Sequence, residues 1–304
     1  MKIDATICIC TFKRPQMLHF LLLKLNEQCG GKYVFDVIVV DNDRFKTAYK
    51  VAEGICDDVG YEIRYFCEEE KNIALSRNMA VKNAAGEFVV FIDDDEFPDA
   101  GWLGRLIDTC KKQKVDGVLG PVLPSYDESA PLWLKKSGLC DRKRFKTSTL
   151  LNEPALMRTG NVLLRRSLFA HELLFDKRFG LSGGEDSDFF ARALSHGYQF
   201  AWCDEAKVYE HIPIERCGAG YHIKRAFLRG ALNARRSKSV LSAPVLKSAV
   251  AVSIYSLMYP FLFLSGRHHF MRYLVKSCDH WGRLLGVFGI EPVKDRSFME
   301  KKNV

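Results

Sequence analysis

The chain has 304 residues, of which 47% are hydrophobic and 27% are charged. This length and balance are typical of a folded globular protein with a substantial core, in one large domain or two smaller ones. The ten cysteines include no CxxC pair, which argues against a zinc ribbon. The apolar stretch at the N-terminus is too short for a signal peptide, so we expect a protein of the reducing cytoplasm.

The net charge of +8 is unevenly distributed along the chain. Residues 222–304 contain 15 Lys and Arg against 4 Asp and Glu, a net charge of +11, whereas residues 1–221 have 30 against 33, a net charge of −3. A basic C-terminal region predicts a polyanion or an anionic membrane surface as its partner. We therefore expect a catalytic domain over 1–221 and a helical, membrane-associating region over 222–304.

The first hundred residues alternate between apolar runs and helical patterns. The runs read as strands, and the segments between them have apolar residues at helical spacing. Continuous apolar strands that alternate with helices predict a mostly parallel sheet covered on both faces. The expected strands are the apolar runs 5–12, 35–43 and 87–92 and the alternating segment 62–68. The expected helices begin at Arg14-Pro15 and span 46–58 and 72–86.

The rest of the chain is less regular. Residues 121–160 contain four prolines and predict loops and short elements, and they are followed by strand and helix patterns over 159–169, 180–203 and 206–213. Residues 222–238 predict a basic amphipathic helix. Residues 248–266 carry no charge, and they contain Pro260. This segment fits an interfacial helix, and a helix buried against the catalytic domain is an open alternative.

Four adjacent acidic residues follow the apolar run Phe88–Ile92: Asp93, Asp94, Asp95 and Glu96. Ligands of parallel sheets bind beyond the carboxyl ends of the strands, which is where these residues fall. Neighbouring carboxylates repel one another, and a cation relieves the repulsion. Because Mg²⁺ often binds one or two carboxylates together with substrate phosphates, the run predicts a metal and diphosphate site. Taken alone, it is equally compatible with a solvated acidic turn.

Four segments in order resemble an inverting family 2 glycosyltransferase with the GT-A fold: "TICICTFKRP", "VIVVDND", "NIALSRNMAVKNAAGEFVVFIDDDEFP" and "GGEDSDFFARALSHG". The resemblance covers residues 3–215 and is similar to the succinoglycan glucosyltransferase group of bacterial exopolysaccharide and lipopolysaccharide enzymes. It implies an α/β fold and transfer from a nucleotide-diphosphate donor, expected to be a UDP-sugar. The implied acceptor is a hydroxyl of a glycan or a polyprenyl-linked sugar in surface polysaccharide synthesis. The implied cofactor is Mg²⁺ or Mn²⁺.

The same resemblance assigns roles on the donor side. Asn42 stands where the family usually has a second aspartate. Because its amide offers a donor as well as an acceptor, uracil is the expected base and another base is an open alternative. For His211, the alternative to a metal ligand is an ordinary surface histidine. The donor-binding residues implied are Cys10, Thr11, Asp41, Asn42, Arg77, Asp93 and Asp94, and the implied metal ligands are Asp95, Asp93 and His211.

On the acceptor side, the resemblance implies that Asp186 is the general base and Glu185 its neighbour. Both residues would also favour a helix N-terminus through the helix dipole, and the two roles are compatible. Gly160 and Asn161 resemble the acceptor-side strand of the family. Trp133 is a weak candidate for stacking on a sugar, since a core tryptophan is the more frequent explanation.

Other classes of protein fit the sequence less well. A nucleotidyltransferase would need a glycine-rich phosphate loop, and "TFKRPQ" has no glycine; a phosphatase would need an aspartate nucleophile on the first strand, and "ICICTF" has none. A non-catalytic nucleotide-sugar-binding or membrane scaffold on the same fold remains the alternative. Nucleic acid is not expected as a partner, because the basic residues of the tail alternate with long apolar runs. We expect a peripheral location on the cytoplasmic face of the inner membrane.

Overall fold

The apolar runs of the first hundred residues form one half of a seven-stranded sheet. Strands β1 to β4 lie side by side in the order β3-β2-β1-β4, and all three pairings are parallel. Their bounds are β1 Ala5–Thr11, β2 Phe35–Asp41, β3 Ile63–Cys67 and β4 Phe88–Ile92. The computed structural model describes residues 2–171, 173–181, 183–234, 239, 242–290 and 292–293.

The other half of the sheet follows in the order β4-β8-β6-β9. Strand β8 (Asn161–Arg165) is antiparallel to both β4 and β6 (Gly117–Leu119), and β6 is parallel to β9 (Phe200–Trp202). The predicted mixed, mostly parallel sheet is therefore confirmed. A second sheet has the order β5-β10-β7, with bounds β5 Glu96–Pro98, β10 Val208–Ile212 and β7 Val122–Tyr126.

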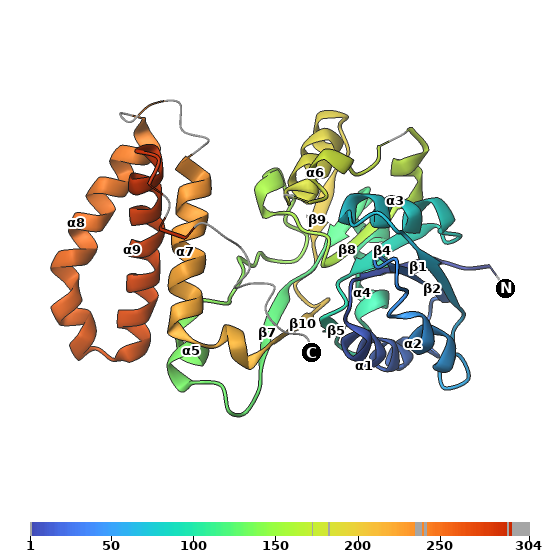
Figure 1. Ribbon diagram of the computed structural model, residues 1–304. Coiled ribbons are helices and arrows are strands. Elements are labelled where there is room, and N and C mark those ends of the chain that lie inside the picture. The colour runs from blue at the N-terminus through green and yellow to red at the C-terminus, as the bar shows by residue number, and fades with distance from the viewer. Residues whose placement is uncertain are drawn as a thin grey trace. The chain divides into compact units, whose positions relative to one another are not determined.

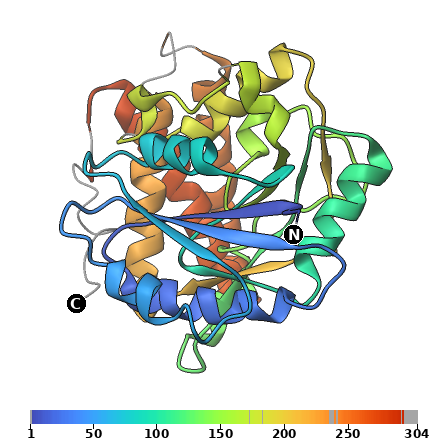
Figure 2. The same ribbon diagram turned by 90° about the vertical axis from the view of Figure 1, so that its right-hand side faces the viewer.

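Helices cover both faces of the large sheet, which explains why its strands are apolar throughout. Along β1, Ile7 and Ile9 belong to one core cluster and Cys8 to the other. The first cluster includes residues of α1 and α4, and the second includes residues of α3 and α6. Figure 2 shows β1 and β2 between α3 above and α1 below. The helices are α1 Pro15–Leu25, α2 Tyr49–Gly54, α3 Ile73–Asn83, α4 Trp102–Gln113 and α6 Glu185–Ser195.

The sheet directs several chain segments to one edge. Since β1, β2 and β4 are parallel, Thr11, Asp41 and the acidic segment after Ile92 lie at the same edge. Strand β8 runs the other way, and its first residue, Asn161, pairs with Ile92. The residues just before β8 therefore reach this edge too, where the acidic run begins.

The chain divides into two units. The sheet unit comprises Met1–Pro124 and Arg142–Glu210, and the helical unit comprises Ser125–Asp141 and His211–Val304. This division differs from the predicted boundary after residue 221, because 125–141 and 211–221 belong to the helical unit.

The helical unit contains three long helices, α7 (Ala219–Ala234), α8 (Ala243–Leu264) and α9 (Arg267–Val287), and the short α5 (Leu132–Ser137). Glycines bring α7 and α9 close together (Figure 1): a Cβ at Gly230 would lie 2.0 Å from the Asp279 carbonyl oxygen. Pro260 lies inside α8 and does not end it. The predicted basic helix over 222–238 corresponds to α7, and residues 235–238 lie outside the described residues.

Short 3₁₀ helices complete the fold. They are η1 Asn26–Gln28, η2 Pro154–Leu156, η3 Arg166–His171, η4 Lys177–Phe179 and η5 Ile214–Arg216. Among the described residues, one helix, Ala243–Leu264, is long and apolar enough to cross a membrane by length and composition. Only 22% of its most apolar window is buried.

Candidate active site

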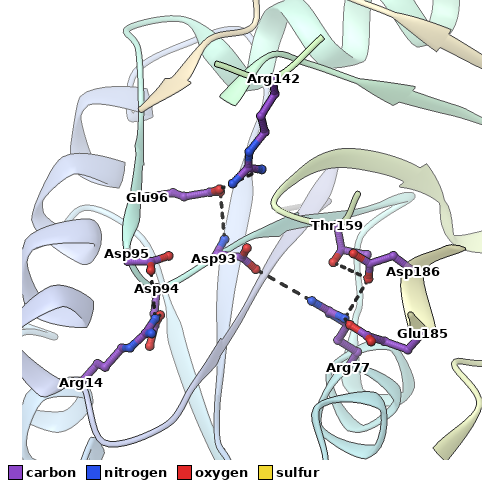
Figure 3. A network of polar contacts seen from close by, with 10 residues as sticks. All are labelled: Arg14, Arg77, Asp93, Asp94, Asp95, Glu96, Arg142, Thr159, Glu185 and Asp186. Atoms are coloured by element: carbon purple, nitrogen blue, oxygen red, sulfur yellow. Dashed lines mark hydrogen bonds and ion pairs between the residues drawn. The ribbon is translucent and has the colours of Figure 1, made fainter. Parts of the chain in front are cut away.

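A network of acids and arginines occupies the carboxyl edge of the large sheet (Figure 3). It brings together six carboxylates and three guanidinium groups. With every group ionised, the negative charges exceed the positive ones by three, and a divalent cation would reduce this excess. The acids are Asp93, Asp94, Asp95, Glu96, Glu185 and Asp186, and the bases are Arg14, Arg77 and Arg142.

Arg14, one residue before α1, binds the centre of the acidic run. Its Nη1 lies 2.8 Å from Asp94 Oδ1 and 3.0 Å from Asp95 Oδ2. The Thr11 hydroxyl donates to the other oxygen of Asp94 at 2.7 Å. Burial raises the pKa of Asp94, and Arg14 opposes that rise. Asp94 is therefore held inside the protein by Arg14 and by Thr11, the last residue of β1.

Asp93 is the most open carboxylate of the run, with 46% of its side-chain surface accessible. The surrounding protein desolvates the carboxyl, and Asp95 and Asp186 repel its charge, which together raise the pKa of Asp93 to about 7; Arg77 opposes the rise. The remaining exposure means that water screens part of this effect. A carboxyl with this pKa gains from a nearby cation, which would lower the pKa and favour the ionised form.

Glu96 is the most buried carboxylate of the acidic run. Its side chain is 1% exposed, and its Oε2 accepts the Asp93 backbone N–H at 3.3 Å. Arg142 Nη1 is 3.9 Å from Glu96 Oε1, an ion-pair distance too long for a hydrogen bond, and Arg142 also pairs with Glu210. Burial raises the pKa of Glu96 well above its usual range.

Arg77 of α3 joins the acidic run to the first turn of α6. Its Nη1 lies 2.5 Å from Glu185 Oε1 and 2.9 Å from Asp186 Oδ1, and its Nη2 is 3.9 Å from Asp93 Oδ1. The Arg77 side chain is only 8% exposed. The predicted phosphate-binding arginine is thus placed at the site with its guanidinium paired to carboxylates.

Asp186 has one occupied oxygen and one without a donor. Its Oδ1 accepts both Arg77 and the Thr159 hydroxyl, the latter at 3.0 Å. Within the described part of the chain, no hydrogen bond to its Oδ2 is found. The carboxylate is thus oriented through one oxygen, and the second can accept a proton.

Two glycines set the position of Asp186. Gly183 and Gly184 have φ values of 79° and 102°, a left-handed conformation that residues with a Cβ rarely adopt. This turn starts α6 at Glu185, so both acids lie in the first turn, where the helix dipole favours negative charge. The motif "GGED" therefore combines a backbone requirement with a charge placement.

Gly160 fits directly against the acidic run. A Cβ there would lie 2.7 Å from Glu96 Oε1 and 3.0 Å from Asp93 Oδ2. Glycine is required by this close approach. Asn161 is 2% exposed, and its amide donates to the Pro121 and Ala206 carbonyl oxygens at 2.9 and 2.8 Å. Gly160 and Asn161, the two residues predicted for the acceptor side, are therefore buried residues that determine the shape of the site.

The side chains after β2 are used within the protein. Asp41 accepts the Ala48 N–H at 2.8 Å and the Tyr65 hydroxyl at 3.0 Å. The Asn42 amide donates to two carbonyl oxygens and accepts the Asn72 N–H at 2.9 Å. These bonds fix the loop at the sheet edge, and a contact of either side chain with a nucleotide base remains a prediction.

The other predicted residues are placed as follows. Cys10 is the penultimate residue of β1, and burial raises its pKa to about 12, so the thiol stays protonated at neutral pH. His211 lies on β10 in the helical unit with an exposed side chain. Trp133 is 8% exposed in the core of that unit, where its ring meets His222 edge-on, which is the behaviour of a core tryptophan.

Sequence reasoning assigned no role to three residues of this network: Arg14, Arg142 and Thr159. Arg14 belongs to "TFKRP" and Arg142 to the charged run "DRKRFK", so a signal was present for both. An arginine in a loop can pair with any acid, and only the fold shows which one it meets. Thr159 gave no signal, because its role depends on the antiparallel course of β8.

The described residues include no group of three His, Cys, Asp or Glu side chains arranged to hold a metal ion. The donor chemistry nevertheless fits Mg²⁺ or Mn²⁺, since the acidic run offers hard carboxylate oxygens in excess over cations. Mg²⁺ binds through one or two carboxylates, waters and substrate phosphates and needs no protein cage. Asp93 and Asp95 are the residues that would hold it.

This fold and this acidic edge define a GT-A glycosyltransferase. The model of the family "Glycosyl transferase family 2" matches residues 6–172, more than half of the chain. The chain belongs to this family, and it is a glycosyltransferase. This membership favours the enzyme over the non-catalytic scaffold that the sequence left open.

Individual relatives agree with the family. The chain is 29% identical over 299 residues to the succinoglycan biosynthesis protein ExoM of Rhizobium meliloti (strain 1021). The alignment covers 95% of this chain and 94% of ExoM. It is 22% identical over 210 residues to the glycosyltransferase AglE of Haloferax volcanii, covering 66% of this chain and 64% of AglE. The similarity to the succinoglycan type that the motifs indicated is thus confirmed.

Solved structures of S. aureus TarS share the fold. Residues 1–349 of TarS match with a TM-score of 0.57 at 16% identity, covering 94% of this chain and 92% of TarS. The same fragment in complex with UDP-GlcNAc matches with a TM-score of 0.56 at 16% identity, covering 95% and 93%. At this identity the likeness establishes the GT-A fold, as predicted.

Proposed function

We propose that this chain transfers a sugar, with inversion, from a UDP-sugar to a hydroxyl of a glycan or lipid-linked sugar in surface polysaccharide synthesis. The observation that carries the proposal is the Asp186 carboxylate, held through Oδ1 by Arg77 and Thr159 with Oδ2 left to accept a proton. The name of ExoM supports a polysaccharide product, and the TarS complexes with UDP and UDP-GlcNAc support the nucleotide.

The proposed reaction is a single displacement. Asp186 Oδ2 takes the proton of the acceptor hydroxyl while its oxygen attacks the anomeric carbon of the donor. The bond from that carbon to the diphosphate breaks, and the nucleoside diphosphate leaves with the electron pair. The transition state resembles an oxocarbenium ion. One base and a direct attack invert the anomeric centre.

A divalent cation bound by Asp93 and Asp95 would supply charge neutralisation for the leaving diphosphate. Asp95 also pairs with Arg14, and its side chain is 14% exposed. Arg77 fixes Asp93 and Asp186 on either side of its guanidinium, so the protein positions the donor-side and acceptor-side carboxylates through one residue.

The stereochemistry of the product tests this mechanism. Incubation with α-linked UDP-sugars and Mg²⁺ or Mn²⁺ is expected to yield a β-configured sugar, as transfer product or as the first-formed hydrolysis product. Proton NMR distinguishes the anomers by the coupling of the anomeric proton. An α-configured first product would contradict inversion and the role given to Asp186.

We also propose that α8 attaches the protein to an anionic membrane surface. Its exposed apolar side chains recur every three or four residues and so form one face. They are Leu246, Val250, Ile254, Leu257, Phe261 and Leu264, each at least 49% exposed. The three long helices of the unit also carry eight basic residues, which suits an anionic headgroup layer. They are Lys224, Arg225, Arg229, Lys247, Arg267, Arg272, Lys276 and Arg283.

Replacement of Leu257 and Phe261 by Gln is expected to lower binding to vesicles at least tenfold, because each buried apolar side chain contributes about 1.5–3 kcal/mol. Flotation with phosphatidylcholine vesicles containing phosphatidylglycerol measures this. The matched control is Phe288→Gln with Ile290→Gln, two exposed apolar residues beyond α9. Equal flotation of the wild type and the α8 variant would contradict the proposal.

A further inference from the structure

A cavity of about 210 Å³ lies in the sheet unit beside the active site. Ten residues line it; three of them are cations and none is acidic. Since one water occupies roughly 30 Å³ in the liquid, the volume corresponds to about seven waters. The cavity therefore suits one sugar ring or one small charged group rather than a whole oligosaccharide. The three cations are Arg142, Lys143 and Arg158.

Two of these cations have no carboxylate partner. Arg142 pairs with Glu210, but among the residues that the structure describes no carboxylate lies within ion-pair distance of Lys143 or Arg158. Arg158 donates instead to the Met157 carbonyl oxygen at 3.0 Å and to the Ser187 hydroxyl at 3.3 Å. The cavity thus has an excess of positive charge, opposite in sign to the acidic edge.

The walls of the cavity are fixed. Trp202, 5% exposed, donates from Nε1 to Asp204 at 3.1 Å. Asn161 is held by its two donated hydrogen bonds, and Gly120 lies so close that a Cβ there would be 2.5 Å from the Asn161 amide nitrogen. The part of the wall that these three residues form is therefore held in place, which lowers the cost of ordering it on binding.

The cavity shares one segment of chain with the candidate base. Arg158 lines the cavity, and the next residue, Thr159, donates to Asp186. Arg158 also contacts Ser187, which follows Asp186 on α6. The cavity is therefore linked to the candidate base through Arg158 and its neighbour Thr159.

We propose that this cavity is an acceptor subsite for an anionic group, a phosphate or a carboxylate, bound by Lys143 and Arg158. The inference rests on the proposed function, which it deepens by giving the acceptor a charge. Either chemical source fits: a lipid-linked diphosphate carries phosphates, and an acidic sugar carries a carboxylate. Charge-assisted hydrogen bonds from Lys and Arg recognise both.

The proposal is tested by calorimetry, in which the UDP-saturated protein is titrated with inorganic phosphate, with glucuronate and, as the neutral probe, with glucose. Phosphate or glucuronate is expected to bind, and Lys143→Gln with Arg158→Gln is expected to weaken that binding at least tenfold. The control is Lys50→Gln with Lys112→Gln, exposed lysines outside the cavity that give the same change in net charge. Binding of phosphate assigns the lipid diphosphate as the source, and binding of glucuronate assigns the acidic sugar.

Two results would overturn the subsite: neither anion binds the UDP-saturated wild type, or the cavity variant binds as tightly as the wild type. The affinity for UDP is measured in the same preparations. If the wild type does not bind UDP, the proposed function itself is contradicted. If it binds UDP but neither anion, only the subsite is contradicted.

Discussion

Asp186→Asn is expected to lower kcat by about 10²–10⁴, the usual contribution of a positioned general base. Asparagine has the same shape and can still accept from Arg77 and Thr159, so the site keeps its geometry. Its amide group cannot take the proton of the acceptor hydroxyl. The affinity for the donor nucleotide is expected to stay near that of the wild type. Steady-state transfer rates and nucleotide titrations measure the two effects separately.

The matched control is Asp188→Asn. Asp188 lies two residues further along α6 and pairs with Arg192 at 2.8 Å, and both side chains are partly exposed. Its replacement is expected to change kcat less than about twofold, because an exposed pair contributes at most about 1 kcal/mol. Transfer by Asp186→Asn near the wild-type rate would show that another group is the base.

Arg77→Met is expected to destabilise the sheet unit by about 3–5 kcal/mol, the cost of removing one partner from a buried ion pair. Arg77 is the shared cation of Glu185, Asp186 and Asp93, and methionine leaves their charges without it. For a unit of this size the loss corresponds to a decrease in Tm on the order of 10 °C. Thermal unfolding measures the decrease, and transfer activity is expected to be lost with it.

The pH dependence distinguishes this cause from lost packing. Arg77 lowers the pKa of Asp93, so its removal raises a pKa that is already about 7. A carboxyl whose folded pKa is raised favours the folded state as the pH falls, because the folded protein then binds more protons. The part of the deficit that comes from Asp93 should therefore shrink as the pH falls towards about 7, and it should stay constant below that pH, where the wild type is protonated as well. A deficit that does not depend on pH would contradict the electrostatic account.

Arg192→Met serves as the control for Arg77→Met. Arg192 also pairs with an acid, Asp188, but its side chain is 34% exposed. Its replacement is expected to cost less than about 1 kcal/mol. A similar loss of stability in both variants would show that burial of the Arg77 network is not what makes it important.

Local sequence patterns predicted the elements that local physics determines. Apolar runs correctly indicated β1, β2 and β4, because both faces of each of these strands are covered. The alternating pattern correctly indicated β3, whose residues are half-buried. The helix predicted from residue 72 begins at Ile73, and Asn72 caps it by accepting the N–H groups of Ala74 and Leu75. The helix ends at Asn83, before the end of the predicted span 72–86. Gly86 permits close approach to β1: a Cβ there would be 2.6 Å from the Ala5 carbonyl carbon.

Features that depend on long-range contacts were not predicted. The reversal of β8 between β4 and β6 brings Thr159 to Asp186, and no periodicity encodes such a crossing. The return of residues 125–141 to the helical unit is equally invisible to a boundary read from charge. The acidic run was found because four adjacent carboxylates are costly without cations, whereas the arginines that pair with them come from distant loops.

Calorimetric titration with UDP, with Mg²⁺ or Mn²⁺ and then with EDTA, tests most directly whether the acidic edge is a metal and nucleotide site. UDP is expected to bind in the presence of metal, and its affinity is expected to fall at least tenfold with EDTA or in Asp95→Asn. Asp99→Asn is the control, since Asp99 is 41% exposed and its nearest ion-pair partner is Arg105 at 3.7 Å. The same UDP affinity with metal, with EDTA and in Asp95→Asn would contradict the assignment of the acidic run.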